Sequence, residues 1–337
     1  MTAYVLRRIL AAVLMLFVVS LVTFGIFFLV PRLAGQTVDQ LAAQYVGRNP
    51  DPVQIHAIEV KLGFDQPLYV QYGRFVKAIL FGADYQNGPD VSHCPAPCFG
   101  YSFRNQQPVW PQMMNALPVT GSLAIGAAIL WLVAGVSIGV LSALKRGSFF
   151  DRAAMTIALG GVSLPIFFTA LIALALFRDT LQVFPDAGSY IPFLSNPFRW
   201  AEALVLPWVT LAFLYAALYA RLTRAGMLET MGEDFIRTAR AKGLPERTVV
   251  LKHGLRASLA PITTIFGMDL GLLVGGAVLT ETAFSLPGLG QFAINAINNN
   301  DLPEIMGVTM LAGFFVVVAN LVVDLLYAVI DPRVRFS

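Results

Sequence analysis

The chain has little charge and few of the residues from which active sites are built. Only 13% of its 337 residues are charged, and it contains three histidines and two cysteines, whereas an average soluble domain is about 25% charged. The histidines do not form an H-E-x-x-H pair, which excludes a zincin site, and the absence of any Gly-Lys dipeptide excludes a Walker P-loop. These absences indicate a non-catalytic chain that holds no metal and does not bind ATP through a P-loop.

Apolar residues are abundant instead, and they are gathered into long runs. The sequence is 57% hydrophobic with 25 phenylalanines, and about 20 apolar residues suffice to span a bilayer as a helix. Two of the runs carry one carboxylate each, Asp269 and Asp324. The pattern predicts an all-α polytopic membrane protein with six spans, namely Ile9–Val30, Leu117–Leu144, Ala153–Phe177, Ala203–Ala220, Ala257–Thr280 and Ile305–Ile330.

The basic residues predict the orientation of these spans. Fifteen of the 23 Lys and Arg residues fall at the termini or in the second and fourth connections, on one predicted side, and short loops rich in Lys and Arg stay in the cytoplasm. Both termini are therefore expected to be cytoplasmic, and the net charge of +3 reflects topology rather than nucleic-acid binding. The first run is longer than a signal-peptide core, so it is expected to be a retained helix.

The segment 31–116 is predicted to be a small extracytoplasmic cap. Its apolar residues between Ile55 and Leu80 recur at near-helical spacing, which is typical of folded rather than disordered chain. Cys94 and Cys98 follow His93 in this cap, where the compartment permits a disulfide. A three-ligand metal site with His93 and two free thiols are the alternatives. The expected division is 1–30, the cap at 31–116, a five-helix core at 117–330 with a cytoplasmic loop at 221–256, and a cytoplasmic tail at 331–337.

Two carboxylates are expected at membrane depth, where an acid usually faces a bundle interior, a partner or a polar path. Asp269 lies in mid-span between two glycines, so it is the candidate for lining a translocation path, with a helix-bonded structural acid as the alternative. Asp324 lies one turn from Asn320 and before Arg333, which favours a structural role with a nearby partner.

One cytoplasmic stretch, Gly232–Pro245, is predicted to contain a short docking helix. Acids at its start and bases at its end suit the helix dipole, while Gly243 and Pro245 provide a stop. Phe235, Ile236 and Ala239 would form a small apolar face. A helix this short is marginal alone, so it is expected to dock onto another surface; a helix lying on the membrane is the alternative.

The sequence of this stretch resembles the cytoplasmic signature of one transporter family. Residues 235–244, followed by His253–Ala257 and Pro261, are similar to that signature in the inner-membrane permease subunits of dipeptide/oligopeptide (peptide/nickel-type) ABC importers. Arg237-Thr238-Ala239 replaces the Glu-Ala-Ala of the general importer pattern E-A-A-x-x-x-G, as is usual in the peptide branch. The resemblance extends over nearly the whole chain, including 4–8, 62–67, 280–285 and 324–327, but not the Cys94–Cys98 insertion.

The resemblance implies a type I ABC importer permease fold in a bacterial inner membrane. The chain would form a path for di- or oligopeptides with a homologous second permease, in contact with membrane lipid. Two cytoplasmic ATPases would bind the ATP and Mg, so this chain would hold no cofactor, and an external substrate-binding protein would deliver cargo. The coupling helix would act through Phe235, Ile236, Thr238, Ala239, Arg240, Lys242 and Gly243.

Four alternatives stay open at this stage. The same architecture could carry oligosaccharide or metal-chelate cargo. A stand-alone secondary transporter would show matching interrupted helices in two halves, and an intramembrane aspartyl protease would need a G-x-G-D motif, where the chain has Gly267-Met268-Asp269.

Overall fold

A computed structural model describes residues 2–46, 51–87, 90–184, 188–275 and 277–330 of the chain. Helices account for most of these residues. They divide into two compact units. The first unit comprises Met1–Thr120, Val274–Val278 and Pro287–Ser337, and the second comprises Gly121–Leu273 and Leu279–Leu286. Helix α6 (Val109–Leu144) begins in the first unit and continues into the second.

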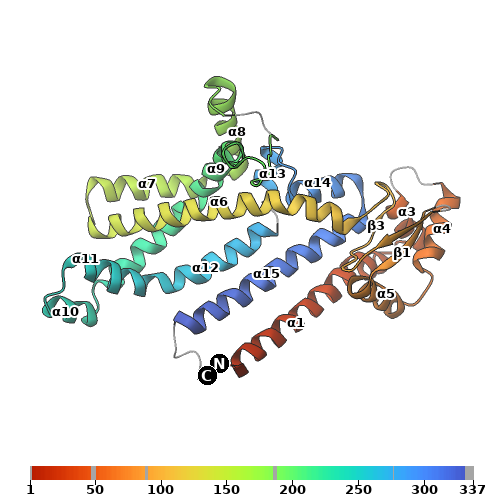
Figure 1. The fold of residues 1–337 in the computed structure, drawn as a ribbon, viewed down its shortest axis with the longest axis horizontal. Coiled ribbons are helices and arrows are strands. Elements are labelled where there is room, and N and C mark those ends of the chain that lie inside the picture. Colours follow the sequence, from red (N-terminus) through yellow and green to blue (C-terminus); the bar gives the residue numbers. More distant parts are fainter. Residues whose placement is uncertain (1, 47–50, 88–89, 185–187, 276, 331–337) are drawn as a thin grey trace. The chain divides into compact units, whose positions relative to one another are not determined.

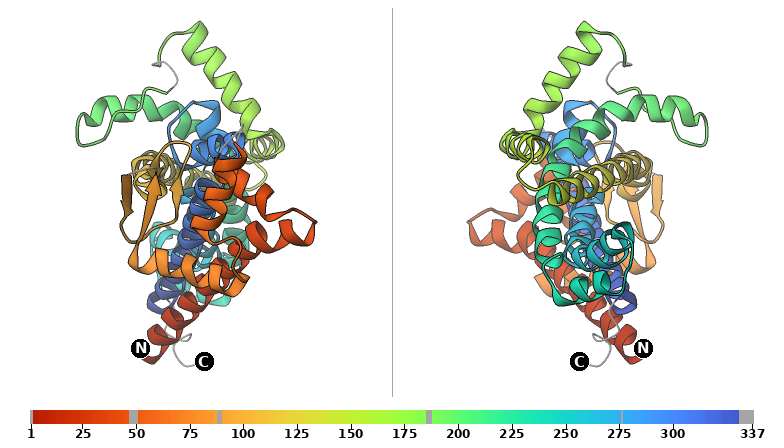
Figure 2. Two further views of the ribbon diagram at one scale, coloured as in Figure 1. Left: turned by 90° about the vertical axis from the view of Figure 1, so that its right-hand side faces the viewer. Right: turned by 90° about the vertical axis from the view of Figure 1, so that its left-hand side faces the viewer.

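The first unit is built on two long apolar helices that lie side by side. Helix α1 (Thr2–Phe24) continues through η1 (Gly25–Leu29) and α2 (Val30–Leu33), and it packs along α15 (Leu302–Ile330), as the red and blue ribbons of Figures 1 and 2 show. The contact is close because α15 has Gly313 where a Cβ would stand 2.7 Å from the Val19 side chain. Helix α14 (Leu289–Asn299) also packs on α15.

Asp324 anchors this helix pair at one end. Its carboxylate lies 2.8 Å from the Arg8 guanidinium, and the Tyr4 hydroxyl donates to its backbone carbonyl at 3.2 Å. The structural partner is therefore Arg8, which is 316 positions away, rather than a neighbour on its own helix. The other residue considered, Arg333, lies outside the described residues.

The cap also belongs to the first unit, and it combines helices with two hairpins. Its elements are α3 (Val38–Val46), α4 (Pro52–Leu62), α5 (Leu68–Phe81), β1 (Ala83–Asn87), β2 (Asp90–Cys94), β3 (Tyr101–Ser102) and β4 (Gln107–Pro108). The near-helical spacing of the sequence corresponds to α4 and α5, whereas the antiparallel pairs β1–β2 and β3–β4 were not predicted.

The two cysteines form a disulfide within this cap. Cys94 and Cys98 are joined at 2.10 Å and both side chains are buried. His93 points elsewhere: its Nδ1 lies 2.6 Å from the carboxylate of Asp84, its register partner on β1. In the described cap, His93 therefore contacts a carboxylate across the hairpin and is not grouped with the two sulfur atoms.

The second unit holds the remaining helices. They are the later part of α6, then α7 (Phe149–Ser163), α8 (Ile166–Ala173), η2 (Leu174–Thr180), α9 (Pro197–Thr230), α10 (Asp234–Ala241), α11 (Glu246–Thr248), η3 (Val249–Leu255), α12 (Arg256–Val274) and most of α13 (Val278–Ala283). Glycines bring α6 against α9, since a Cβ on Gly135 would stand 2.7 Å from the Tyr219 side chain and one on Gly139 2.7 Å from the Ala220 carbonyl oxygen.

The long apolar helices of the structure correspond to four of the six predicted spans, and two bent helix pairs correspond to the other two. In the described part of the chain, four helices are long and apolar enough to cross a membrane: Tyr4–Leu33, Val109–Leu144, Pro197–Thr230 and Leu302–Leu325. Two further pairs, Phe149–Ser163 with Ile166–Thr180 and Glu246–Leu259 with Pro261–Val274, bring the number to six if each bent pair is one span. The third run is not straight, because the chain turns by 104° at Pro165, the N-cap of α8 (Figure 1).

Candidate functional site

The short helix that the sequence predicts within residues 232–245 is α10, and its two ends have the expected chemistry. Glu233 is the N-cap residue and Asp234 occupies the first turn. At the other end Gly243 adopts φ +74°, the Gly243 N–H bonds to the Arg240 carbonyl at 2.9 Å, and the Leu244 N–H bonds to the Ala239 carbonyl at 3.4 Å. This pair of hydrogen bonds is a Schellman motif, in which a left-handed residue ends the helix. Gly243 therefore sets the direction in which the chain leaves α10.

The apolar residues of α10 are divided between two faces. Ile236 and Ala239 are buried against Val249 of η3 and Met231 at the end of α9. Phe235 is 47% exposed. Two of the three residues predicted to form a docking face thus hold α10 on its own chain, and only Phe235 presents an apolar side chain outward.

The charged residues of α10 pair within the chain. Arg240 forms two hydrogen bonds with Glu246, at 3.1 and 2.7 Å, and Arg237 lies 3.2 Å from Asp234. Both pairs are exposed, so each adds little stability. The Arg240–Glu246 pair closes the turn around Gly243, a role that the helix pattern did not predict. Lys242 is exposed, and no ion pair to it occurs among the described residues.

The residues that pack beneath α10, Met231 and Val249, connect it to the long helices α9 and α6, and we call these residues and the cluster next to them its support. Met227 on α9 and Val250 on η3 form a buried cluster with Val140 and Ala143 of α6. Residue Gly254 lies close to Met231, because a Cβ there would stand 2.9 Å from the Met231 sulfur. Figure 1 shows α10 beyond the end of α9, on the side where α7 begins. A displacement of α10 would therefore act directly on the ends of α9 and η3.

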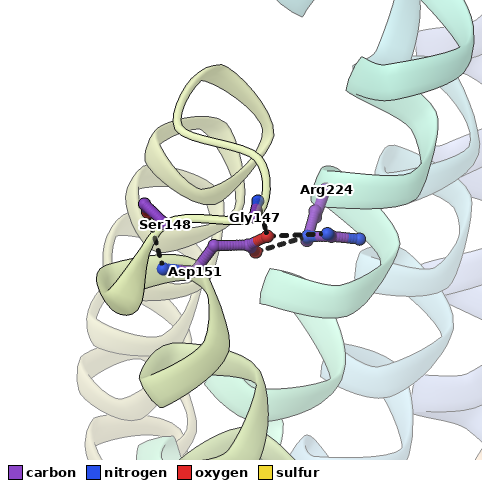
Figure 3. Close-up of polar contacts among 4 residues, drawn as sticks. All are labelled: Gly147, Ser148, Asp151 and Arg224. Atoms are coloured by element: carbon purple, nitrogen blue, oxygen red, sulfur yellow. Dashed lines mark hydrogen bonds and ion pairs between the residues drawn. The ribbon is translucent and has the colours of Figure 1, made fainter.

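An ion pair that was not predicted ties α7 to α9 near this support (Figure 3). The Arg224 guanidinium donates to both carboxylate oxygens of Asp151, at 2.6 and 2.8 Å, and the Gly147 N–H donates to the same carboxylate at 2.8 Å. Ser148 caps the start of α7 by accepting from the Asp151 N–H at 3.2 Å. Asp151 is buried. The bidentate geometry fixes both orientation and distance, so it braces the first turn of α7 against α9.

The second candidate region surrounds Asp269 in the same unit. The Tyr219 hydroxyl donates to the Asp269 carboxylate at 2.8 Å, and Tyr219 belongs to an aromatic group with Trp131, Tyr215 and Phe266. Asp269 is half-buried, and no cation pairs with it among the described residues. A carboxylate held by one hydroxyl keeps acceptor capacity for a further donor.

Comparison with known proteins places the chain in one family. The family described as "Binding-protein-dependent transport system inner membrane component" matches residues 135–336, and its N-terminal counterpart, "Binding-prot-dependent transport system membrane comp, N-term", matches residues 1–124. The chain belongs to this family. It is therefore a multi-pass inner-membrane component of a bacterial transport system, and the predicted family resemblance is confirmed.

Individual relatives of this family member match it from end to end. A Brucella abortus (strain 2308) protein that carries the name of a peptide transport system permease protein is 39% identical over 337 residues, with 100% of both chains covered. The dipeptide transport system permease protein DppB of Alkalihalophilus pseudofirmus is 36% identical with 100% of both covered. DppB of Escherichia coli (strain K12) is 34% identical with 99% of both covered.

The solved structures support the fold of this transport component. A chain of the inward-facing MetNI methionine ABC transporter aligns with a TM-score of 0.51 and 18% identity, and the alignment covers 66% of this chain and 97% of that one. The identity is low, so this likeness concerns the fold alone. The predicted ABC importer permease fold is confirmed.

Proposed function

We propose that this chain is the permease subunit of an ATP-driven importer and lines the path for di- or oligopeptides. The full-length similarity to three proteins named as peptide or dipeptide permeases carries this proposal. The match covers both the membrane spans and the cap, so the similarity is not limited to a common membrane domain. Oligosaccharide and metal-chelate cargo are less well supported, because the cited relatives are named for peptides.

In this proposal α10 is the coupling helix. It presents Phe235 outward while Ile236 and Ala239 fix it to α9 and η3, so an outside partner can move it only together with those elements. Two cytoplasmic ATPases would bind the ATP and Mg, and this chain would bind neither. Closure of the ATPases would displace α10 as a rigid body and transfer the motion to the spans. A second permease would complete the path, and an external binding protein would deliver the peptide.

The orientation of the chain in the membrane follows from the assignment of α10 as the coupling helix. The loop that carries α10 must face the cytoplasmic ATPases, and with six spans both termini then lie on that side. The 15 Lys and Arg residues on this side agree with the preference of basic residues for the cytoplasm.

Reconstitution tests the proposed function. The chain would be placed in proteoliposomes alone, and also with its partner permease, the two ATPases and the binding protein, and uptake of a labelled dipeptide, a trisaccharide and a nickel chelate would be measured. We expect ATP-dependent uptake of the dipeptide by the complete system and no uptake by the chain alone. Uptake by the chain alone would identify a secondary transporter, and exclusive uptake of either other cargo would reject the peptide assignment.

Asp269 is proposed to line the path and to accept a hydrogen bond from a cationic or amino group of the cargo. Asp269→Asn keeps the shape of the side chain and removes its charge, so we expect uptake of peptides with a free amino terminus to fall roughly tenfold, the effect of about 1.4 kcal/mol. Tyr219→Phe is the matched change, since it removes the hydroxyl donor and retains the carboxylate. If Asp269→Asn leaves the uptake of every tested peptide unchanged at normal yield, Asp269 is structural.

A further inference from the structure

The first unit contains a cavity whose lining includes neither α10 nor Asp269. It measures about 640 Å³ and lies between η1 and the end of α1, helix α5, the cap hairpins and the start of α15. This volume is within the range of roughly 300–1,000 Å³ that is usual for small-ligand sites. Its walls are rich in aromatic rings, from Phe24, Phe28, Phe64, Phe75, Tyr101 and Phe103.

Two cations stand on the wall of this cavity. Arg74 and Lys77 of α5 both line it and are exposed, and neither forms an ion pair among the described residues. The Arg74 guanidinium lies over Gly63, where it leaves no room for a Cβ. The acid in the lining, Asp84, bonds to His93 at 2.6 Å. The cavity thus combines an apolar interior with two cations and one carboxylate, and among the described residues neither cation is paired with that carboxylate.

A tyrosine hydroxyl on the same wall of the cavity can donate a hydrogen bond to an anion. Burial raises the pKa of Tyr85 to about 12, so its hydroxyl is protonated at neutral pH and can donate a hydrogen bond. Gln71 is also in the lining, but its amide nitrogen is committed to the Phe64 and Gln66 carbonyls, at 3.1 and 2.7 Å.

The position of α5 along α1 places this cavity beside the bilayer. The Tyr72 hydroxyl lies 2.8 Å from the Ser20 hydroxyl, and the Tyr72 ring packs edge-on against Phe24. Ser20 precedes the end of the span Tyr4–Leu33 by 13 residues, or roughly 20 Å at 1.5 Å per residue. Because Ser20 and Phe24 lie at and just beyond the middle of this span, α5 lies beside the apolar span itself.

The outward face of α5 has the composition of a helix in contact with lipid. Tyr69, Leu80 and Phe81 on this helix are 77%, 61% and 76% exposed. Large exposed apolar side chains together with Arg and Lys on one short helix are typical of helices that lie in the membrane interface, where long basic side chains extend toward headgroups.

From these observations we infer that the cavity binds one anionic phospholipid, with its phosphate at Arg74 and Lys77 and an acyl chain against the aromatic wall. The cations supply charge-assisted hydrogen bonds to phosphate oxygens, and the aromatic rings bury hydrocarbon. An acyl chain accounts for the apolar wall, which a free phosphate would leave uncovered. The exposed apolar side chains of α5, Tyr69, Leu80 and Phe81, favour a lipid over a peptide carboxylate from the aqueous phase.

Photolabelling of the full-length chain in lipid nanodiscs tests this site. Phosphatidylglycerol and phosphatidylcholine probes with a diazirine on the acyl chain would be compared, and the adducts mapped by peptide mass spectrometry. We expect phosphatidylglycerol to label peptides of the cavity wall at least fivefold more than phosphatidylcholine. Arg74→Glu with Lys77→Glu should reduce that labelling to the phosphatidylcholine level, whereas Arg74→Lys with Lys77→Arg should preserve it.

The controls separate this site from general attraction to charge and from other anions. Lys145→Glu with Arg152→Glu changes two exposed cations of the second unit and should leave the cavity adducts unchanged, and all variants should elute normally in gel filtration. Excess unlabelled phosphatidylglycerol should compete. Equal labelling by both probes, insensitivity to the Arg74 and Lys77 charge reversal, or competition by inorganic phosphate or a dipeptide in place of the lipid would overturn the inference.

Discussion

Gly243→Val is expected to reduce ATP-dependent uptake by roughly tenfold or more while the protein still accumulates in the membrane. Gly243 adopts φ +74° at the end of α10, and a left-handed conformation costs an L-residue about 1–2 kcal/mol, with β-branched residues the least tolerant. Relief of this strain would break the hydrogen bonds from Gly243 and Leu244 and turn α10 away from its support. Uptake, ATP hydrolysis and yield of the reconstituted complex would be measured together.

Two variants make this prediction specific to α10. Gly243→Asn should retain most of the uptake, because asparagine tolerates the left-handed region. Gly35→Val places the same residue at a glycine with φ +88° and open space around it, outside α10, and should leave uptake nearly unchanged. Normal transport by Gly243→Val would refute the coupling role of the helix, and an equal loss in Gly35→Val would reduce the effect to general strain.

Removal of the Arg224 side-chain charge is expected to be the most destabilising of the single changes. In Arg224→Gln the buried Asp151 carboxylate keeps its charge and loses two short hydrogen bonds, and an unpaired buried charge is costly. We expect the melting temperature of the purified protein to fall by roughly 5–10 °C. The melting temperature of Arg224→Lys should lie between those of Arg224→Gln and the native chain, because lysine retains the charge without the bidentate geometry.

A double variant tests whether the unpaired Asp151 charge causes the loss of stability in Arg224→Gln. Asp151→Asn with Arg224→Gln leaves no unpaired charge, so it should melt above Arg224→Gln alone. Arg237→Gln removes a similar but exposed pair with Asp234 and should melt like the native chain. If the double variant is no more stable than Arg224→Gln, the two side chains act independently and do not form the brace between α7 and α9.

The sequence predicted the elements whose causes are local. Long apolar runs marked the spans, and the ends of α10 followed from Asp234 at its start and Gly243 at its stop, since capping depends on residues within one turn. Burial on α10 was harder to predict: Phe235, Ile236 and Ala239 look alike as an apolar set, yet only the packing of Val249 and Met231 shows that Phe235 points outward.

Pairs between distant residues could not be read from the pattern. Asp151 and Arg224 are 73 positions apart, and Asp324 meets Arg8 at the other end of the chain. An acid in an apolar run predicts that some partner exists, because an isolated charge there is expensive, but several cations are equally available in sequence. The 104° turn at Pro165 likewise lay within a run that appeared long enough to be one straight span.

The sequence by itself determined that this protein crosses a membrane many times, which family it resembles and where the short helix α10 begins and ends, because hydropathy, capping and motif spacing are local properties. The tertiary structure alone decided which face of α10 is free, how α7 is held to α9, and that α5 and α1 enclose an aromatic cavity with two cations on its wall. Those features depend on residues brought together across tens to hundreds of positions, and their contacts come from packing.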